Sequence, residues 1–323
     1  MRNYHGLLEA IGNTPIISLD NLFSDSINKF YLYAKLEYLN PGGSAKDRSG
    51  YSMMLHARDE GLINEDTVII ESSSGNLGIA LAQICMLWNL KFICVIDPKT
   101  TLQNIQLLKL YGAQIEYVSE PDKETGEFLQ ARINRVNELL KEYGNSYRPN
   151  QYANLYNPEG HKKAAKEIFD YFKNDLDYIF CAVSTCGTIR GYSEYIKNNG
   201  LATKVIAVDA VGSVIFGDER KKRLIPGHGA AIVPQLYNDG IADECIHVSD
   251  IECLQGCRKL LKQEGIFAGG STGAVVSAIE KYIPRIESSA KCAFIVHDRG
   301  ERYLNNIYSD AWVKEHFNME VEL

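Results

Sequence analysis

Short apolar runs alternate along the chain with stretches whose apolar residues recur at helical spacing. The runs 67–71 and 92–96 flank a stretch in which Leu77, Leu81 and Ile84 share one helical face. Further runs of the first kind lie at residues 114–118, 178–183, 205–208 and 292–296. All of them are apolar enough to be buried on both faces of a sheet. The pattern therefore predicts parallel sheets covered by helices, which is an α/β fold.

Length and composition narrow the class of protein. The chain has 323 residues, of which 45% are hydrophobic and 23% charged, values typical of an ordinary globular protein. At this length two lobes sharing a cleft are favoured over one core. The formal net charge is -7 and no long basic run is present, which argues against a nucleic-acid partner. The basic cluster 219–223 is interpreted as a solvated charge run, with a lid as the alternative.

The lack of an apparent targeting signal and the scattered cysteines predict a cytoplasmic protein. The first residues lack the apolar run of a signal peptide, and no segment reaches the roughly 18 apolar residues of a membrane-spanning helix. The 8 cysteines are scattered, and Cys253 and Cys257 have helical spacing rather than that of a metal knuckle. We expect a cytoplasmic protein with reduced cysteines, no metal site and no membrane partner.

Chemistry in such folds gathers where strands end and helices begin. Four junctions of this kind carry glycine and hydroxyl residues, at residues 40–48, 71–76, 184–188 and 268–273. The third follows a buried strand, so its N–H groups and hydroxyls could converge on a phosphate. The alternative is a turn that uses Gly, Ser and Thr only for capping.

The first junction holds a lysine in an unusual place. Ser44 and Asp47 have the spacing of a capping box, which puts Lys46 in the first turn of a helix opening after Gly42 and Gly43. The helix dipole disfavours a charged lysine there by about 0.3–1 kcal/mol, which favours the neutral amine that a Schiff base needs. A solvated surface lysine is the alternative.

The second junction supplies a third ligand-binding feature. Ser72, Ser73 and Ser74 offer hydroxyls and N–H donors suited to a carboxylate, although serines also serve as simple caps. The Lys46 amine, the serines 72–74 as a carboxylate cradle and the turn 184–188 as a phosphate-binding loop together indicate a phosphorylated aldehyde cofactor. Such a cofactor would act on an amino acid.

The four junctions, in this order, resemble those of the fold type II pyridoxal-phosphate enzymes, the cysteine synthase and cystathionine β-synthase family. Residues 12–15 and 300–304 belong to the same pattern. The resemblance implies a tryptophan synthase β-like α/β fold of two lobes, each with a mostly parallel sheet flanked by helices. It also implies a large cofactor-holding domain of residues 1–43 and 146–323, a small mobile domain of residues 44–145, and a homodimer.

The resemblance assigns roles residue by residue. Lys46 is implied to form the Schiff base with pyridoxal 5'-phosphate, Asn76 to bind the ring hydroxyl and Ser271 to face the pyridine nitrogen. The cofactor's phosphate is implied to rest on Ser184, Thr185, Cys186, Gly187 and Thr188. The substrate carboxylate is implied to contact Ser72, Ser73, Ser74 and Gln151. The family usually has glycine where this chain has Cys186.

Longer stretches resemble the members of this family that make N-(2-amino-2-carboxyethyl)-L-glutamate, a siderophore precursor. They lie at residues 35–38, 150–154, 212–218 and 264–273. The expected reaction is β-replacement on O-phospho-L-serine through an aminoacrylate, with L-glutamate as the nucleophile. Arg132, Tyr152 and Ser184 match the positions that bind phosphoserine.

Physical reasoning supports only part of this substrate assignment. Arg132 lies at the edge of an apolar stripe in the helical stretch 126–141, and such an arginine needs an anion. That anion is either a protein carboxylate or the substrate's phosphate. The carboxylates of glutamate also need cations, and the segment from Arg220 to Arg223 is a candidate.

Three other functions compete with this one. The nearest is cysteine synthesis from sulfide and either O-acetylserine or O-phosphoserine. A non-catalytic binding protein of the same fold is the second, because a fold does not guarantee chemistry. A dinucleotide-dependent oxidoreductase is disfavoured, since no predicted strand precedes the full glycine fingerprint.

Overall fold

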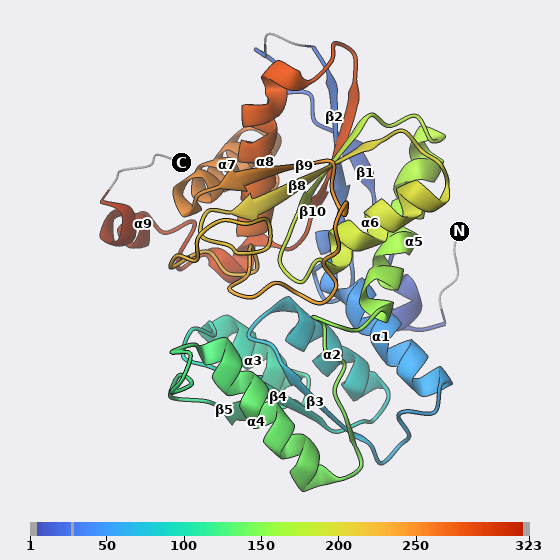
Figure 1. Cartoon of the computed structure of the whole chain (residues 1–323), viewed down its shortest axis with the longest axis vertical. Helices are drawn as coiled ribbons and strands as arrows, with labels where there is room; N and C mark the ends of the chain where they lie inside the picture. Colours follow the sequence, from blue (N-terminus) through green and yellow to red (C-terminus); the bar gives the residue numbers. More distant parts are fainter. Residues whose placement is uncertain (1–4, 27–28, 319–323) are drawn as a thin grey trace.

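Two separate sheets form two lobes in the computed structural model, which describes residues 5–26 and 29–318 (Figure 1). The large sheet has the strand order β1-β2-β10-β7-β8-β9, and only the β1–β2 pair is antiparallel. Its strands are β1 Ile16–Ser18, β2 Tyr31–Leu36, β7 Tyr178–Ala182, β8 Lys204–Ala210, β9 Glu244–Val248 and β10 Lys291–Val296. The small sheet is wholly parallel in the order β5-β4-β3-β6. It contains β3 Val68–Ser72, β4 Phe92–Ile96, β5 Gln114–Tyr117 and β6 Ser146–Tyr147.

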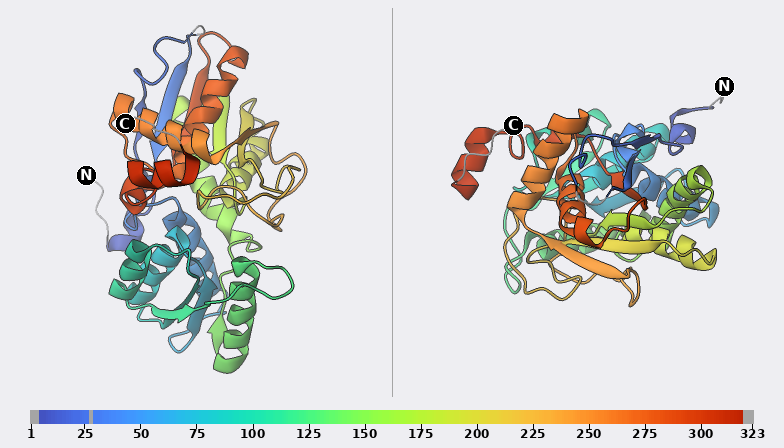
Figure 2. Two further views of the ribbon diagram at one scale, coloured as in Figure 1. Left: turned by 90° about the vertical axis from the view of Figure 1, so that its left-hand side faces the viewer. Right: turned by 90° about the horizontal axis from the view of Figure 1, so that it is seen from above.

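Helices cover both faces of the large sheet. Because side chains alternate along a strand, Phe180 packs on one face with α7 and α8, whereas Ile179 packs on the other with α5 and α6. The helices of this lobe are α5 Tyr156–Phe172, α6 Gly187–Asn198, α7 Asp250–Glu264, α8 Gly270–Tyr282 and α9 Asp310–Phe317. Short 3-10 helices lie at Leu7–Ala10, Glu37–Leu39, Ile283–Arg285 and Gly300–Tyr303. Helix α9 lies on the outside of the large lobe in Figures 1 and 2 and buries Val313 in the core shared with α7 and α8.

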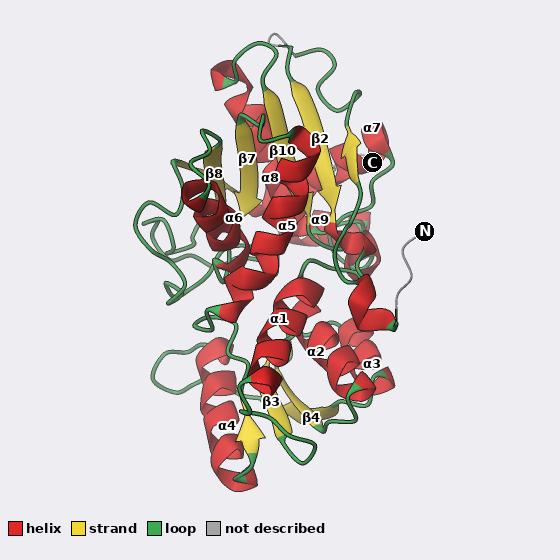
Figure 3. Cartoon of the chain, turned by 90° about the vertical axis from the view of Figure 1, so that its right-hand side faces the viewer, coloured by secondary structure: helices red, strands yellow, loops and turns green. Residues whose placement is uncertain are grey.

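The small lobe repeats this layering on a smaller scale. Ile69 packs on one face with residues of α1, α2 and α3, and Ile70 packs on the other face with Val136 and Leu139 of α4. The helices are α1 Lys46–Asp59, α2 Asn76–Leu87, α3 Leu102–Leu110 and α4 Phe128–Tyr143. Helix α1 lies where the lobes meet and packs on both α2 and α5 (Figure 3).

The predicted α/β fold with two helix-flanked parallel sheets is confirmed, and each of the six predicted strands is present. The prediction that all six are buried on both faces is wrong for β5, which is an edge strand with exposed Gln114 and Tyr117 at its ends. Strands β1, β2, β6 and β9 were not predicted. Their apolar pattern is weak, since β6 has only two residues and β2 carries a lysine in its buried part.

Two absences can be stated for the described part of the chain. No helix there is long and apolar enough to cross a membrane. No group of three or more His, Cys, Asp or Glu side chains in it is placed to hold a metal ion. All eight cysteines are free thiols, and both Cys253 and Cys257 are buried on α7.

Candidate active site

Lys46 is the first residue of α1, as its place in the sequence predicts. The predicted capping box is wrong, however. The Ser44 hydroxyl accepts from the Lys46 N–H at 3.2 Å, while the Asp47 carboxylate turns back to accept from the N–H of Gly42. The turn at Gly42 and Gly43 brings the Gly42 N–H within reach of the Asp47 carboxylate. The carboxylate therefore accepts from this N–H rather than from an N–H group at the helix terminus. The first turn of α1 is thereby tied to the loop before it.

The environment of Lys46 favours the neutral amine. Burial lowers the pKa of the Lys46 ammonium, and the nearby Asp298 carboxylate and Cys186 thiol oppose this effect. The sequence predicted the same direction from the helix dipole alone. In the folded chain, desolvation at the junction of the lobes is the larger cause.

Helix α1 is fixed to the large lobe by four buried or partly buried charges, Lys35, Glu37, Arg48 and Glu167, which we call the buried network. The Arg48 guanidinium lies 2.6 Å from Glu37 and 2.7 Å from Glu167, and the Lys35 ammonium lies 2.7 Å from Glu167. Because Arg48 and Lys46 share the first turn of α1, this network fixes the end of the helix that carries the amine. Each of its charges has an opposite partner, which offsets the desolvation that burial imposes.

The predicted phosphate loop joins β7 to α6. Cys186 there adopts the left-handed conformation with φ of 64° and is the N-cap of α6, without a side-chain cap on the helix N–H groups. Glycine tolerates this conformation best, so Cys186 carries backbone strain that the usual family residue avoids. Gly187 is required by packing, since a Cβ there would lie 2.2 Å from the Asn157 side chain.

A buried histidine joins the phosphate loop to the lysine helix. The Nε2 atom of His161 lies 3.3 Å from the Thr188 hydroxyl and 3.3 Å from the Ser49 hydroxyl. Burial, together with Lys46 and Arg48, holds the pKa of His161 well below its ordinary value, so the ring is neutral and bonds both hydroxyls without adding charge. Lys46 and the phosphate loop are therefore held close together.

Asn76 and Asp298 meet at the same place. Asn76 is the first residue of α2, and its side-chain amide donates to Asp298 at 2.7 Å. Asp298 lies just after β10, forms a bridge with Ser44 and accepts a second bond from the Tyr303 hydroxyl at 2.5 Å. Its other oxygen, Oδ1, is buried without a partner. These contacts align the ends of β3 and β10 around Lys46.

The three serines at the end of β3, of which Ser72 is its last residue, have different surroundings. The Ser73 hydroxyl accepts from the Gly78 N–H at 2.9 Å and so serves the turn, whereas the Ser72 hydroxyl is buried without a partner. Ser74 is half-buried, and its carbonyl oxygen accepts from Asn104. The hydroxyls of Ser72 and Ser74 are therefore better placed to serve a ligand than that of Ser73.

Gln151 and Tyr152 are brought to this end of β3 by a buried carboxylate. Glu71 accepts the Ser72 N–H at 2.8 Å and the Asn150 N–H at 2.6 Å. The carbonyl of Gln151 accepts from Asn157, the residue that contacts the phosphate loop. The carboxylate cradle and the phosphate loop are thus neighbours. Ser271 is the second residue of α8 and is half-buried.

Three arginines, Arg132, Arg148 and Arg223, surround Tyr152, and we call them the arginine cluster. Burial raises the pKa of the Tyr152 phenol, while all three guanidinium groups act on it in the opposite direction. The phenol therefore remains a hydrogen-bond donor at neutral pH. In each arginine the Nε atom is buried and has no hydrogen-bond partner.

The predicted alternative for Arg132, a protein carboxylate, is present in part. Its Nε lies 3.3 Å from Asp97, within ion-pair range but without hydrogen-bond geometry. Glu219 to Lys222 are exposed, as a solvated charge run should be, whereas Arg223 is half-buried. Arg220 pairs with Glu127, the N-cap residue of α4 in the small lobe. Within the cluster 219–223, Arg220 therefore forms a contact between the lobes, whereas Arg223 is the one arginine directed inward.

Three residues of the site, His161, Asp298 and Arg148, were not predicted from the sequence. Asp298 could have been found, because it follows a predicted strand and adjoins the motif at 300–304. His161 lies inside a helix, and Arg148 follows a two-residue strand, so neither carries a local signal.

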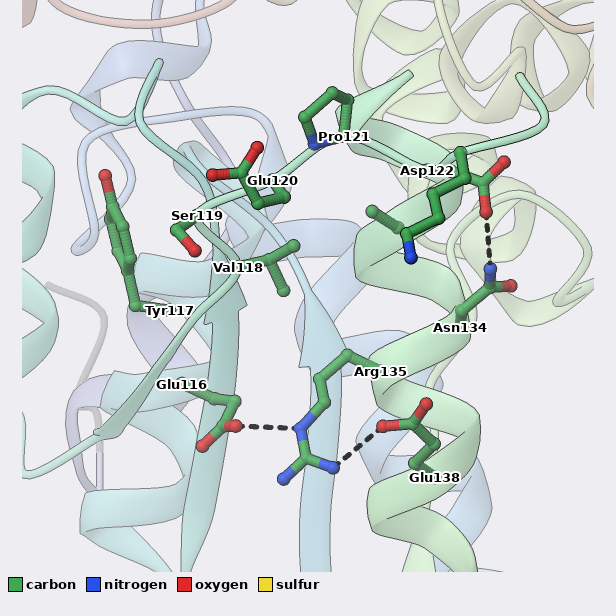
Figure 4. A pocket seen from close by; sticks show the side chains of 12 residues that line it. Glu116, Tyr117, Val118, Ser119, Glu120, Pro121, Asp122, Asn134, Arg135 and Glu138 are labelled. Carbon is green, nitrogen blue, oxygen red and sulfur yellow. Dashed lines mark hydrogen bonds and ion pairs between the residues drawn. The ribbon is translucent and has the colours of Figure 1, made fainter. Parts of the chain in front are cut away.

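A hollow on the outer side of the small lobe, between β5 and α4, lacks the features of a site (Figure 4). Arg135 pairs there with Glu116 at 2.7 Å and Glu138 at 2.9 Å, and Asn134 donates to Asp122 at 3.0 Å. The charged groups of Arg135, Glu116 and Glu138 are thus already paired with one another at the surface.

The residues at the junction fit pyridoxal phosphate. Three helices, α2, α6 and α8, begin there with N-cap residues whose side chains make no cap. Ser73 takes the Gly78 N–H of α2, and the other first-turn N–H groups are left for a phosphate and ring substituents. The buried Asp298 Oδ1 and Ser72 hydroxyl lack partners, and the Lys46 amine favours its neutral form. Lys46 would hold the aldehyde, residues 184–188 the phosphate and Asn76 the ring hydroxyl.

Comparison with known proteins agrees with this geometry. Residues 7–298 match the family model described as pyridoxal-phosphate dependent enzyme. The O-acetylserine dependent cystathionine β-synthase of Helicobacter pylori is 31% identical, with a TM-score of 0.88 over 96% of this chain and 100% of that one. The hydrogen sulfide-producing enzyme of Fusobacterium nucleatum is also 31% identical, with a TM-score of 0.86 over 94% and 99%. An O-ureido-L-serine synthase is 26% identical, with a TM-score of 0.86 over 99% and 98%.

Proposed function

The chain belongs to the family of pyridoxal-phosphate dependent enzymes and is of its β-replacement type, and we propose that its substrates are O-phospho-L-serine and L-glutamate. The products are then N-(2-amino-2-carboxyethyl)-L-glutamate and inorganic phosphate. The C–O bond at Cβ of phosphoserine breaks, and a C–N bond to the α-amine of glutamate forms at the same carbon. The amine's proton is released, so the atoms balance without another reactant. The product is a precursor for siderophore synthesis.

The observation that carries the substrate assignment is the state of Arg132. Its side chain is only 12% exposed, and its buried Nε has no hydrogen-bond partner although Asp97 is 3.3 Å away. A guanidinium in this state can still form a charge-assisted bond to a phosphate oxygen. Tyr152 stands beside it with a protonated hydroxyl. O-acetylserine has no anionic group at its β-position to use these donors.

The residues around Lys46 divide the chemistry between them. When bound, pyridoxal phosphate supplies the electron sink that makes the Cα proton acidic and allows the β-substituent to depart. The neutral Lys46 amine accepts that proton, and Ser72, Ser74 and Gln151 hold the substrate carboxylate beside it. Arg132, Tyr152 and Ser184 bind the phosphate and stabilise its charge as it leaves. Ser271, a neutral group, would face the ring nitrogen and would not protonate it.

The arrangement of the lobes supports closure over the substrate. We propose that residues 44–145 form a small domain that moves against the cofactor-holding domain of residues 1–43 and 146–323. Its first helix, α1, stays attached to the large domain through the buried network, and strand β6 completes the small sheet from across the boundary. The serine cradle and Arg132 lie on the small lobe, while the phosphate loop lies on the large one. Substrate that contacts both lobes draws them together and excludes water from the reacting carbon. The proposal includes a homodimer, which sedimentation analysis of the holoenzyme tests.

One assay tests the function directly. Purified holoenzyme is given O-phospho-L-serine or O-acetylserine, each with L-glutamate or sulfide, and the products are identified by mass spectrometry. We expect the glutamate adduct and phosphate only from the first donor with glutamate. Efficient cysteine formation without any glutamate adduct would establish the competing function, cysteine synthesis, which the similarity to the O-acetylserine dependent enzyme favours.

The lysine assignment has a test of its own. Reduction of the holoenzyme with borohydride, followed by peptide mapping, should place the cofactor label on the peptide that contains Lys46. A label on another lysine would overturn the assignment without deciding the substrates.

A further inference from the structure

The long segment between β8 and β9, residues 211–243, contains no helix or strand. Segments of this length without regular structure are uncommon in compact proteins and usually functional. This one reaches the active site, because the Leu236 N–H donates to the carbonyl of Tyr152 at 3.2 Å. It also reaches the small lobe through the Arg220–Glu127 ion pair. The segment therefore links the surroundings of Tyr152 with the small lobe.

Within this segment, the Arg223 side chain is held by a hydrogen bond, but its positive charge is not paired with a carboxylate of the described residues. One of its terminal nitrogens, Nη1, donates to the carbonyl of His228 at 2.6 Å, and its buried Nε has no partner. The guanidinium passes over Gly229, where a Cβ would lie 2.7 Å from Nη1. Among the described residues, no carboxylate lies within the 4.0 Å of an ion pair with Arg223. Arg132 and Arg148, by contrast, have Asp97 at 3.3 Å and Glu71 at 3.5 Å.

The two carboxylates whose charges act on Arg223, those of Asp209 and Asp250, already accept hydrogen bonds from backbone N–H groups. Asp250 accepts the N–H groups of Leu224 and Ile225 at 2.7 and 3.2 Å, and Asp209 accepts those of Ala210 and Phe216 at 2.8 and 3.3 Å. Their charges act on Arg223 only from a distance, and burial lowers the pKa of its guanidinium. A half-buried cation in this state gains most from an anion that is not part of the fold.

We propose that Arg223 is the specificity-determining residue for the second substrate and binds a carboxylate of the incoming amino acid. The inference rests on the proposed function, because it takes the nucleophile to be glutamate. Arg132 on the small lobe faces the phosphate of the first substrate, and Tyr152, which precedes α5 of the large lobe, contacts it as well. Arg223 acts on the same tyrosine from the large lobe, within the segment 211–243. The two substrates are thus distinguished by arginines on opposite lobes.

The test compares Arg223→Gln with the wild-type holoenzyme in two half-reactions. Phosphate release from O-phospho-L-serine without glutamate reports the first half-reaction and should be unchanged. In the full reaction, the KM for glutamate should rise about 10- to 100-fold, as expected for loss of one hydrogen bond to a charged group. The inhibition constant of glutarate, a dicarboxylate without an amine, should rise by a similar factor.

Two further variants keep the test decisive. Arg223→Lys restores a cation and should recover part of the affinity for glutamate, which a purely structural role would not predict. Arg285→Gln removes an exposed guanidinium of the same lobe, at the end of α8 opposite Ser271, and should leave the KM for glutamate unchanged. Thermal unfolding of each holoenzyme checks that the fold is intact.

The outcomes separate this inference from the function on which it rests. If Arg223→Gln leaves the KM for glutamate unchanged, or impairs phosphate release instead, the inference is overturned while the function stands. A wild-type enzyme that releases phosphate but never forms the glutamate adduct overturns the proposed function itself, before any variant is compared.

Discussion

The buried network and the arginine cluster both place charges inside the protein, but they treat those charges differently. In the network, Arg48 lies within 2.7 Å of two carboxylates, and Lys35 shares one of them. In the cluster, the three arginines have carboxylates at 3.3 Å, at 3.5 Å and none within ion-pair range among the described residues. Each Nε of the cluster also lacks a hydrogen-bond partner.

This difference indicates different roles for the two sets of charges. A charge that is fully paired inside the fold has little left to offer a ligand, whereas an incompletely paired cation raises the energy of the free protein and gains from an anion. The network therefore acts as a structural clamp on the helix of Lys46. Under the proposed function, the unpaired donors of the cluster bind the substrates. The comparison predicts that removing a network charge affects stability first, and that removing a cluster charge affects catalysis first.

The largest effect is expected from Arg48→Met. The substitution leaves Glu37 and Glu167 without their main partner, and the free energy of unfolding should fall by about 3–5 kcal/mol. Urea denaturation followed by circular dichroism measures it. Arg135→Met is the matched control, because Arg135 contacts Glu116, Glu138 and Glu142 at the surface and should cost about 1 kcal/mol or less. Equal losses in the two variants would remove the distinction between buried and surface pairs.

Arg132→Leu should lower catalysis strongly and stability little, which is the opposite of the effect expected for Arg48→Met. The free energy of unfolding should change little, since the Asp97 contact is poorly aligned, while kcat/KM for O-phospho-L-serine should fall about 30- to 1,000-fold. Steady-state kinetics and urea denaturation on the same preparation test both halves. Arg135→Leu, on the same helix but directed to the surface, serves as the control. Unchanged kinetics in Arg132→Leu would remove the phosphate-binding role of the cluster.

Asp47 offers a test by pH at the edge of the buried network. Burial raises the pKa of its carboxyl from 3.8 to about 7, so the folded state favours the protonated form. The resulting stabilisation is complete below pH 3.8 and is lost as the pH rises through about 7. Asp47→Asn does not titrate, so its stability relative to the wild type should increase between pH 4 and pH 8. A constant difference over this range would contradict the assigned pKa shift.

The smallest effect is expected where no charge changes. Cys186→Gly relieves the left-handed strain at the phosphate loop and should raise the free energy of unfolding by about 1 kcal/mol or less. Thermal unfolding measures it, and cofactor affinity should be retained because the backbone N–H at this position is kept. A clear loss of stability would show that the cysteine side chain contributes more by packing than it costs by strain.

Much of the fold and of the site was predictable because both depend on local patterns. Apolar runs such as 178–183 indicated the buried strands, and the junction motifs indicated where a lysine, serines and a phosphate loop would lie. The weak strands β1, β6 and β9 were missed because they are short or only half-buried, and their pairing is decided by neighbouring strands. The capping box at Ser44 failed because a turn outside the helix offered Asp47 a nearer donor.

The amino-acid sequence by itself determined the α/β class, the order of the strand–helix junctions and the residues with the chemistry for the cofactor. Only the tertiary structure decided which charges have partners. Arg48 meets Glu167, and Asn76 meets Asp298, across long stretches of chain, while Arg223 meets no carboxylate at all among the described residues. The physical reason is that an ion pair or a hydrogen bond depends on separation in space, and local patterns do not contain the distances between residues far apart in the chain.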